Sequence, residues 1–165
     1  MHCCAWNTVA ARIITIDTSP DKLQLEAKLG ATDLINPEDG DIVEMVLDMT
    51  AGDVHHSIQF LGLKKTAEQT FQVTGRGGAA TIVGMVPYGS NIEADGPNLL
   101  YERRLQGSFM GGGSFRTDMS RLIEFYRQGR LQLDERISNR ISLEQANAGF
   151  AAMEAGAGMR SLIGF

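Results

Sequence analysis

The sequence has few cysteines and no long apolar run. Its two cysteines, Cys3 and Cys4, are adjacent and cannot easily form an unstrained disulfide, so nothing indicates an oxidising compartment. No apolar stretch approaches the roughly 20 residues that span a bilayer. Residues 1–11 lack the basic start and long apolar stretch of a signal peptide. We therefore expect a cytoplasmic protein with no membrane segment and a truncated N-terminus.

An excess of positive charge is also lacking. Lysine and arginine number 15 against 20 aspartates and glutamates, which gives a net charge of -5 at pH 7. This balance gives no electrostatic reason to expect binding to nucleic acid or to an anionic membrane. With 165 residues, of which 43% are hydrophobic, the chain is long enough for one domain that buries roughly 70% of its unfolded surface.

Short apolar strands alternate with helices of about ten residues. The β-branched run at residues 12–17 predicts a buried strand. Ser19 as N-cap and Pro20 at the first helical position then predict a helix that Gly30 stops. The same alternation predicts further strands at 32–36, 54–60, 79–85 and 105–110, with helices at 42–49 and 65–73.

This alternation predicts an α/β fold: an incomplete, Rossmann-like, doubly wound parallel sheet with helices on both faces. An amphipathic helix at 117–128 follows the glycines at 111–114. A last β-α-β passage ends the chain, and Ser142 with Gln145 predicts a capping box for its helix. We expect this helix to turn apolar side chains inward, namely Leu143, Ala146, Phe150 and Met153.

An acidic side chain ends the first predicted strand. In a doubly wound sheet, an acid in this place accepts hydrogen bonds from the ribose hydroxyls of a nicotinamide dinucleotide. Asp17 fits this role, and its charge would repel a ribose phosphate, which favours NAD over NADP. The alternative is an aspartate that only begins the turn before a helix.

Ordered segments across residues 11–165 carry a resemblance to a known family. The chain resembles the zinc-dependent, medium-chain alcohol dehydrogenases in RIITIDTSPDKLQLEAKLGATDLINPEDGD, SIQFLG, GRGGAATIVGM, ERRLQGSFMGG and GMRSLIGF. The resemblance implies hydride transfer between an alcohol or aldehyde and NAD, with a catalytic zinc polarising the substrate oxygen. It implies a truncated dinucleotide-binding domain over 1–110, and a segment over 111–165 that would pack with the catalytic domain in the intact family.

The resemblance also implies roles for individual residues in binding the dinucleotide. Asp17 and Lys22 match the ribose-binding pair, and Leu61 and Leu63 match positions near the adenine. Arg160 matches a position that reaches the pyrophosphate, although a solvated surface arginine is an equal alternative. The positions that offer mostly backbone groups to the nicotinamide carboxamide are Val83, Ser108 and Met110. For Val83 and Met110, ordinary core packing is an alternative of at least equal weight.

The glycine motif of dinucleotide-binding folds is absent before the first predicted strand. G-x-G-x-x-G lets the backbone approach the pyrophosphate at a helix N-terminus, yet residues 1–11 contain no glycine. Without the central strand that precedes this motif, the sheet would have two unpaired inner edges. GRGG at 75–78 precedes a strand and is expected to form a turn. GGGS at 111–114 is expected to be a loop near the nicotinamide rather than a separate phosphate site.

Zinc ligands are also scarce. A catalytic zinc needs three protein ligands, which in the resembled family come from a preceding domain. His2, Cys3 and Cys4 are a weak replacement, because adjacent cysteines rarely point at one ion. His55 and His56 would alternate across a strand, and Ser57 has no evident base beside it. We therefore expect no metal site and no catalytic residue in this chain.

Two hypotheses about function follow. In the first, the chain is part of an NAD-dependent alcohol dehydrogenase, inactive alone, with weak or lost NAD binding. In the second, it is a non-catalytic dimerisation or binding module derived from that fold, since the family region matching residues 99–110 contributes to subunit pairing. Both predict a homodimer. A separate catalytic-domain segment would be a further partner under the first hypothesis.

Overall fold

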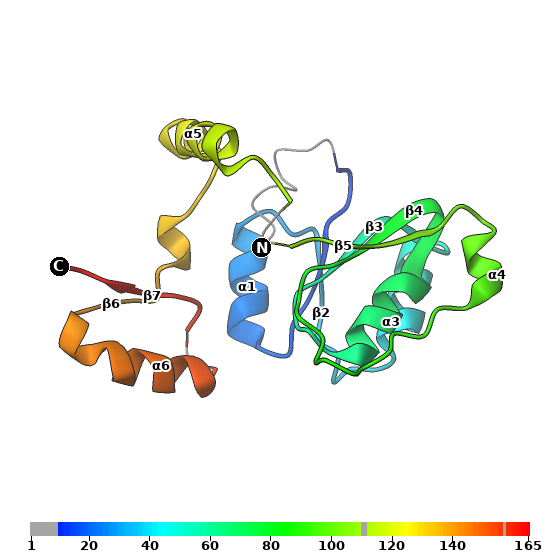
Figure 1. Cartoon of the computed structure of the whole chain (residues 1–165), viewed down its shortest axis with the longest axis horizontal. Coiled ribbons are helices and arrows are strands. Elements are labelled where there is room, and N and C mark those ends of the chain that lie inside the picture. The colour runs from blue at the N-terminus through cyan, green and yellow to red at the C-terminus, as the bar shows by residue number, and fades with distance from the viewer. Residues whose placement is uncertain (1–9, 110–111, 157) are drawn as a thin grey trace. The chain divides into compact units, whose positions relative to one another are not determined.

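A computed structural model describes residues 10–109, 112–156 and 158–165. The chain forms two compact units, of which the first joins the residues up to Asn36 with Phe115–Phe165 and the second is Pro37–Ser114. Figure 1 shows their helices and strands. The division that we predict at residues 110–111 falls outside the described residues and stays a prediction.

The second unit is a parallel sheet with helices packed on it. Its elements are α2 (Ile42–Thr50), β3 (Val54–Gln59), α3 (Lys64–Val73), β4 (Thr74–Ile82), α4 (Gly96–Leu99) and β5 (Arg104–Gly107). The strand order is β3-β4-β5, and all pairs are parallel. Helix α3 lies against β3 and β4 (Figure 1), and α2 packs on α3. The parallel strands with an intervening helix form the predicted β-α-β arrangement.

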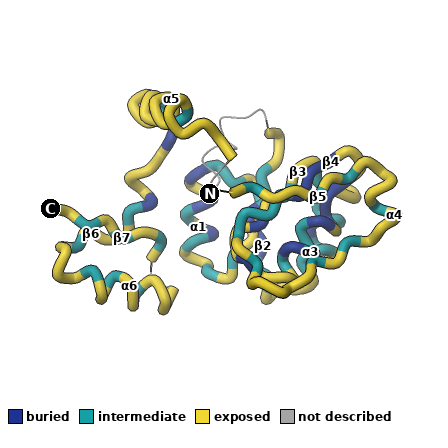
Figure 2. Tube along the Cα trace, viewed as in Figure 1, coloured by how far each residue is buried: buried dark blue, intermediate teal, exposed yellow. Residues whose placement is uncertain are grey.

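The core of the second unit lies between α3 and the sheet. Ala67 and Phe71 from α3 are almost completely buried, as are Ala79 and Ala80 from β4. Residues at i and i+4 share one face of a helix, so this pair of α3 residues faces the sheet together. The dark tube segments in Figure 2 follow these elements.

The first unit contains a shorter parallel pair and the C-terminal part of the chain. Its elements are β1 (Ile14–Ile16), α1 (Pro20–Lys28), β2 (Asp33–Ile35), α5 (Phe115–Arg127), the 3-10 turns η1 (Asp134–Arg136) and η2 (Leu143–Gln145), β6 (Asn139–Ile141), α6 (Ala146–Glu154) and β7 (Ser161–Ile163). Strand β1 pairs in parallel with β2, and β6 with β7. Ser19 caps α1 and Pro20 opens it, as predicted.

The parallel sheet is divided in the described residues, as expected for a fold that lacks its central strand. The strands there form three separate parallel sheets, β1-β2, β3-β4-β5 and β6-β7. The α/β class with parallel strands and packed helices is confirmed. No helix among the described residues has both the length and the apolar character needed to cross a bilayer.

The stretch Gly75–Gly78 is not the turn that we predict. It belongs to β4, which begins at Thr74, and the pairing of β3 with β4 shifts register beside it, between Val54 and His56. A Cβ built on Gly78 would lie 2.8 Å from the backbone carbonyl oxygen of His55 and 2.9 Å from that of Gly75, so only glycine fits there. The glycines thus allow neighbouring backbone segments to approach closely inside an irregular strand.

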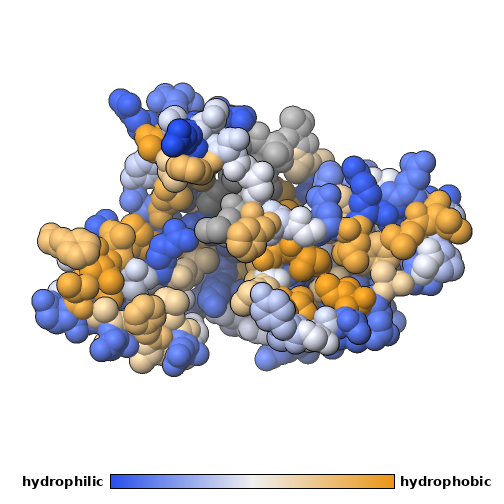
Figure 3. All heavy atoms as spheres, viewed as in Figure 1, coloured by the Kyte–Doolittle hydropathy of each residue, from blue (hydrophilic) through white to orange (hydrophobic). Residues whose placement is uncertain are grey.

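The inward face predicted for the last helix is wrong. The capping box of Ser142 and Gln145 forms as expected, but Leu143, Phe150 and Met153 are all more than half exposed, and Ala146 is only half-buried. Strands β6 and β7 have three residues each, so their sheet is too small to cover a helix face. Hydrophobic side chains gather on the surface of this C-terminal part (Figure 3).

Candidate functional site

Asp17 stands at the carboxyl end of β1 and begins the turn into α1. Its backbone N–H donates to the carbonyl of Ile35 at 3.3 Å, which extends the β1-β2 pairing by one step. Its Oδ1 accepts a hydrogen bond from the N–H of Ser19 at 2.9 Å. Asp17 is half-buried, and its carboxylate Oδ2 accepts no hydrogen bond from the described residues. Asp17 thus begins the turn before α1 through one carboxylate oxygen, and the other has no hydrogen-bond partner among the described residues.

Lys22 lies in the first turn of α1, in the same unit as Asp17. Its N–H donates to Oγ of Ser19 at 3.4 Å, so the same N-cap fixes the start of α1 and the backbone of both candidate residues. Lys22 is half-buried. The Lys22 side chain is long and flexible, so its cation can reach a ribose that is held at Asp17.

The second unit collects the other candidate residues at one edge of its sheet. The register aligns Gln59, Ile82 and Gly107, which are the last residues of β3, β4 and β5. Leu61 and Leu63, Val83, and Ser108 follow these strand ends. Since parallel strands end at a common edge, the structure brings these four residues to the edge where such sheets bind ligands.

Backbone hydrogen bonds hold this edge together. The N–H of Val83 donates to the carbonyl of Gln59 at 2.9 Å, and the N–H of Ser108 donates to the carbonyl of Ile82 at 2.9 Å. Leu61 is 71% exposed, whereas Val83 and Ser108 are half-buried. Val83 is therefore not part of the buried core, which was the alternative to a binding role for this residue.

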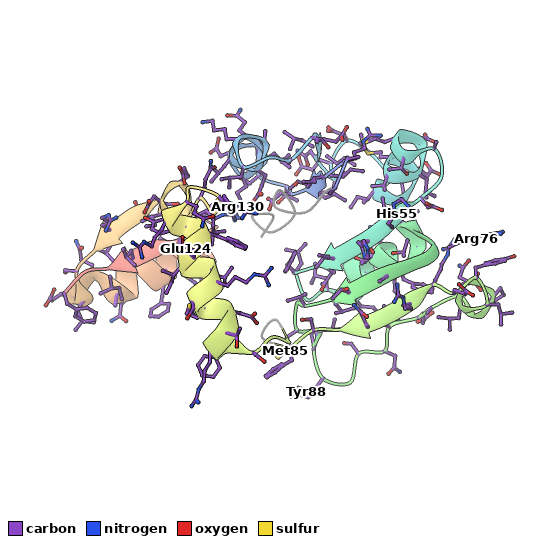
Figure 4. The ribbon with its side chains drawn as sticks, turned by 90° about the horizontal axis from the view of Figure 1, so that it is seen from above. His55, Arg76, Met85, Tyr88, Glu124 and Arg130 are labelled. Carbon is purple, nitrogen blue, oxygen red and sulfur yellow. The ribbon has the colours of Figure 1, made fainter. Side chains whose placement is uncertain are left out.

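Glycines let the exit loops of β3 and β4 touch through their backbones. A Cβ on Gly84 would lie 2.2 Å from the nitrogen of Gly62, and a Cβ on Gly62 would lie 2.5 Å from the carbonyl oxygen of Met85. Gly62 also has φ +74°, which disfavours any other residue. Met85 and Tyr88 lie on the loop that leaves β4 (Figure 4), and both are strongly exposed.

Two candidate residues are less informative. Arg160 precedes β7 in the first unit and is exposed, and its carbonyl accepts hydrogen bonds from the N–H groups of Ser138 and Asn139. Met110 lies outside the described residues. The candidate residues are thus distributed over both units, with Asp17, Lys22 and Arg160 in the first.

The described residues contain no group of three or more histidine, cysteine, aspartate or glutamate side chains suited to a metal ion. His2, Cys3 and Cys4 lie outside the described range. His55 and His56 on β3 are both exposed (His55 is labelled in Figure 4). The Ser57 hydroxyl lies 2.6 Å from that of Thr74 and donates to the carbonyl of Thr70 at 2.8 Å, so it takes part in internal packing.

One strongly perturbed carboxyl group lies at the opposite, amino end of β1-β2. Arg12 donates to both carboxylate oxygens of Asp33, from Nη2 at 2.6 Å and from Nε at 2.7 Å. This paired hydrogen bond, with a second contribution from the Thr32 hydroxyl, lowers the pKa of Asp33 from 3.8 to about 2. The arrangement ties the strand pair together, away from the candidate ligand edge.

The sequence profile of the zinc-binding dehydrogenases matches residues 4–128 of the chain. The chain belongs to this family. Among curated relatives of this zinc-binding dehydrogenase chain, alcohol dehydrogenase class-3 of Cereibacter sphaeroides is 32% identical over 165 residues, covering 94% of the chain and 44% of the relative. S-(hydroxymethyl)glutathione dehydrogenase of Synechocystis is 32% identical over 157 residues, covering 93% of the chain and 42% of the relative.

Solved structures agree with this zinc-binding dehydrogenase assignment. Benzyl alcohol dehydrogenase of Acinetobacter calcoaceticus has a TM-score of 0.93 at 25% identity, over 98% of the chain and 44% of that structure. A zinc-binding dehydrogenase of Sinorhizobium meliloti bound to NADP has a TM-score of 0.88 at 27% identity, over 98% of the chain and 47% of that structure. The chain thus spans less than half the length of these relatives.

Gln59 and Thr66 at the same sheet edge are absent from the candidates that the sequence predicts. Gln59 ends β3 and is 3% exposed, and its Nε2 donates to the Thr66 hydroxyl at 3.0 Å. A single glutamine in an alternating strand carries no motif. The alternation of residues 54–60 places Gln59 on the polar face with Ser57, so the sequence gives no signal that it is buried.

Proposed function

We propose that the chain is the coenzyme-binding part of an NAD-dependent alcohol dehydrogenase, binds the dinucleotide weakly by itself, and does not turn over substrate alone. The observation that carries the proposal is the carboxylate of Asp17 at the end of β1. One oxygen is held by Ser19, and the other accepts no hydrogen bond from the described residues. Membership of the zinc-binding dehydrogenase family supports the reaction class.

In this proposal Asp17 Oδ2 accepts a hydrogen bond from a hydroxyl of the adenosine ribose, and Lys22 lies beside it. Leu61 and Leu63 contact the adenine, while Val83, Ser108 and Met110 offer backbone groups to the carboxamide. Arg160 reaches the pyrophosphate. The family includes a structure bound to NADP, but a carboxylate at Asp17 repels a ribose phosphate, so we propose NAD for this chain.

The family name implies zinc, which polarises the substrate oxygen when it is bound. The described residues offer no cluster with the three ligands that such an ion needs. We therefore assign this chain no catalytic step and restrict its role to holding the dinucleotide.

Calorimetric titration of the purified chain with NAD and NADP tests the proposal. We expect Asp17→Ala to weaken NAD binding roughly tenfold or more, since a charge-assisted hydrogen bond is lost, and to reduce the preference for NAD over NADP. Asp21→Ala removes an exposed acid of α1 and should leave NAD binding unchanged. Absence of NAD binding by the wild-type chain would contradict the proposal, as would NAD-dependent turnover of a simple alcohol that a zinc chelator abolishes.

An edge of the second unit favours the alternative, a dimerisation module. In the described residues β5 pairs only with β4, so its other edge can pair with a strand of a second copy. Sedimentation equilibrium together with the NAD titration separates the two functions. A dimer that does not bind NAD supports the module, whereas NAD binding that depends on Asp17 supports the coenzyme site.

A further inference from the structure

Gln59 occupies an unusual position for a buried polar side chain. It is the last residue of β3, it is 3% exposed, and the loop Phe60–Leu63 follows it directly. Its backbone carbonyl accepts hydrogen bonds from the N–H groups of both Val83 and Gly84, at 2.9 and 3.1 Å. Gln59 is therefore a junction between the exit loops of two neighbouring strands.

The side chain of Gln59 extends this junction to α3. Its Nε2 donates to the hydroxyl of Thr66 at 3.0 Å, and that hydroxyl donates to the carbonyl of Leu63 at 2.9 Å. The same carbonyl accepts the N–H of Ala67 at 3.0 Å, which begins the first turn of α3. The loop Phe60–Leu63 is thus fixed at its start by Gln59 and at its end through Thr66.

The amide of Gln59 is not fully satisfied by this arrangement. Its Oε1 is buried and has no hydrogen-bond partner among the described residues. If the amide were turned by 180°, Oε1 would accept a hydrogen bond from the Thr66 hydroxyl, but the NH2 group would then be the one without a partner. Because a buried polar atom without a partner costs free energy, an apolar side chain of similar volume would suit the core at least as well. Stability alone does not account for a glutamine here.

Movement of the loop Phe60–Leu63 would be transmitted to the loop that leaves β4. Gly84 approaches Gly62 and Phe60 so closely that no Cβ fits between them, and Gly62 in turn abuts the carbonyl of Met85. Packed backbones of this kind do not slide independently. The hydrogen bond between the Gln59 and Thr66 side chains is therefore coupled to the conformation of both exit loops, beside the backbone hydrogen bonds at the Gln59 carbonyl.

We propose that Gln59 is a positioning residue for the dinucleotide, which acts through the Thr66 hydroxyl to hold the exit loops of β3 and β4 in their binding conformation. This inference rests on the proposed function, because Leu61, Leu63 and Val83 lie on those loops. Gln59 itself need not touch the ligand. Its contribution is to fix the backbone in advance, so that binding does not have to order these loops.

The test compares NAD binding by calorimetry in variants of the full chain. Thr66→Val has the same shape but no hydroxyl, and we expect it to weaken NAD binding roughly fivefold to tenfold. Thr66→Ser restores the hydroxyl and should restore affinity. Thr70→Val is the matched control, since the Thr70 hydroxyl donates only to the carbonyl of Thr66 one turn earlier within α3. It should leave NAD affinity unchanged.

A second variant removes the other end of the bond. Gln59→Met keeps the volume without the amide, and we expect the same loss of affinity as for Thr66→Val. The double variant should bind no more weakly than the weaker single variant, because both changes break one interaction. Urea unfolding midpoints of all variants show whether each is folded, and if Gln59→Met does not fold, the comparison of Thr66→Val with Thr66→Ser still decides.

Several outcomes would overturn the inference. Unchanged NAD affinity in folded Thr66→Val would do so, as would failure of Thr66→Ser to restore it, or an equal loss in Thr70→Val. Additive losses in the double variant would mean that the residues act separately. Absence of NAD binding by the wild-type chain would instead refute the proposed function, and the wild-type titration therefore separates the two failures.

Discussion

The central sheet of the second unit and the C-terminal part of the first unit use apolar residues in opposite ways. In the former, Phe71 is 1% exposed and Ala67 is fully buried between α3 and the sheet. In the latter, α5 and α6 contain no buried residue at all among those described. Phe150 is 61% exposed and Met153 is 59% exposed. Apolar helix residues in the two regions thus differ in what covers them.

The difference teaches that an apolar helix face predicts burial only where a sheet of adequate size faces it. Strands β3 and β4, of six and nine residues, present a surface that α3 covers. The three-residue strands β6 and β7 do not. Exposed apolar groups of this extent mark surfaces suited to interaction.

Truncating one phenylalanine in each region gives the largest predicted contrast. Phe71→Ala removes a fully buried ring and should lower the free energy of unfolding by about 3–5 kcal/mol. Phe150→Ala should change it by less than about 0.5 kcal/mol, because the ring is already largely in water. Urea unfolding monitored by circular dichroism measures both. Equal losses would show that Phe150 is buried in solution.

Removing one partner of a buried ion pair gives the next largest expected change in unfolding free energy. This pair lies in the first unit, whose C-terminal helices are exposed. Arg136 Nη1 lies 3.5 Å from Oε1 of Glu26, and both side chains are at most 10% exposed. Glu26→Ala leaves the guanidinium buried, where its Nε and Nη2 already have no partner among the described residues. We expect a loss of about 3 kcal/mol in unfolding free energy.

The double variant Glu26→Ala with Arg136→Leu is the control for that charge. It should recover most of the lost stability, since the pair is then replaced by apolar groups. Urea midpoints decide, and a double variant no more stable than Glu26→Ala would mean that the charge itself is not the cause.

Local signals in the sequence predicted most of the elements. The Ser19 cap with Pro20, and the capping box of Ser142 with Gln145, are correct because a cap depends only on neighbouring backbone groups. The parallel α/β class follows from the alternation of strands and helices. The position of Asp17 at a strand end was predictable for the same reason, although its binding role stays a prediction.

Features that depend on distant residues were not predictable. Gly75–Gly78 resembles a turn in sequence, and only its close approach to the backbone of His55 and the register shift between β3 and β4 show that it is an irregular strand. The exposed face of α6 depends on the size of the sheet beside it. Gln59 became a candidate only once Thr66 and the exit loop of β4 were placed around it.

Acid titration of the Arg12–Asp33 pair is the smallest predicted effect and returns to the amino end of β1-β2. The pKa of Asp33 is about 2 in the folded chain against 3.8 for the free group. Because the folded pKa is the lower one, the pair stabilises the fold above pH 3.8, and this contribution is lost as the pH falls toward 2. Both side chains are partly exposed, so the change is modest.

Removing either partner should remove that pH dependence. Arg12→Met and Asp33→Asn should each lower the melting temperature at pH 7 by roughly 1–3 °C, and the difference from wild type should shrink as the pH falls through the same window. Differential scanning calorimetry between pH 7 and pH 2 measures this. A difference that persists undiminished at the acid end would mean that the side chains stabilise β1-β2 by packing rather than by charge.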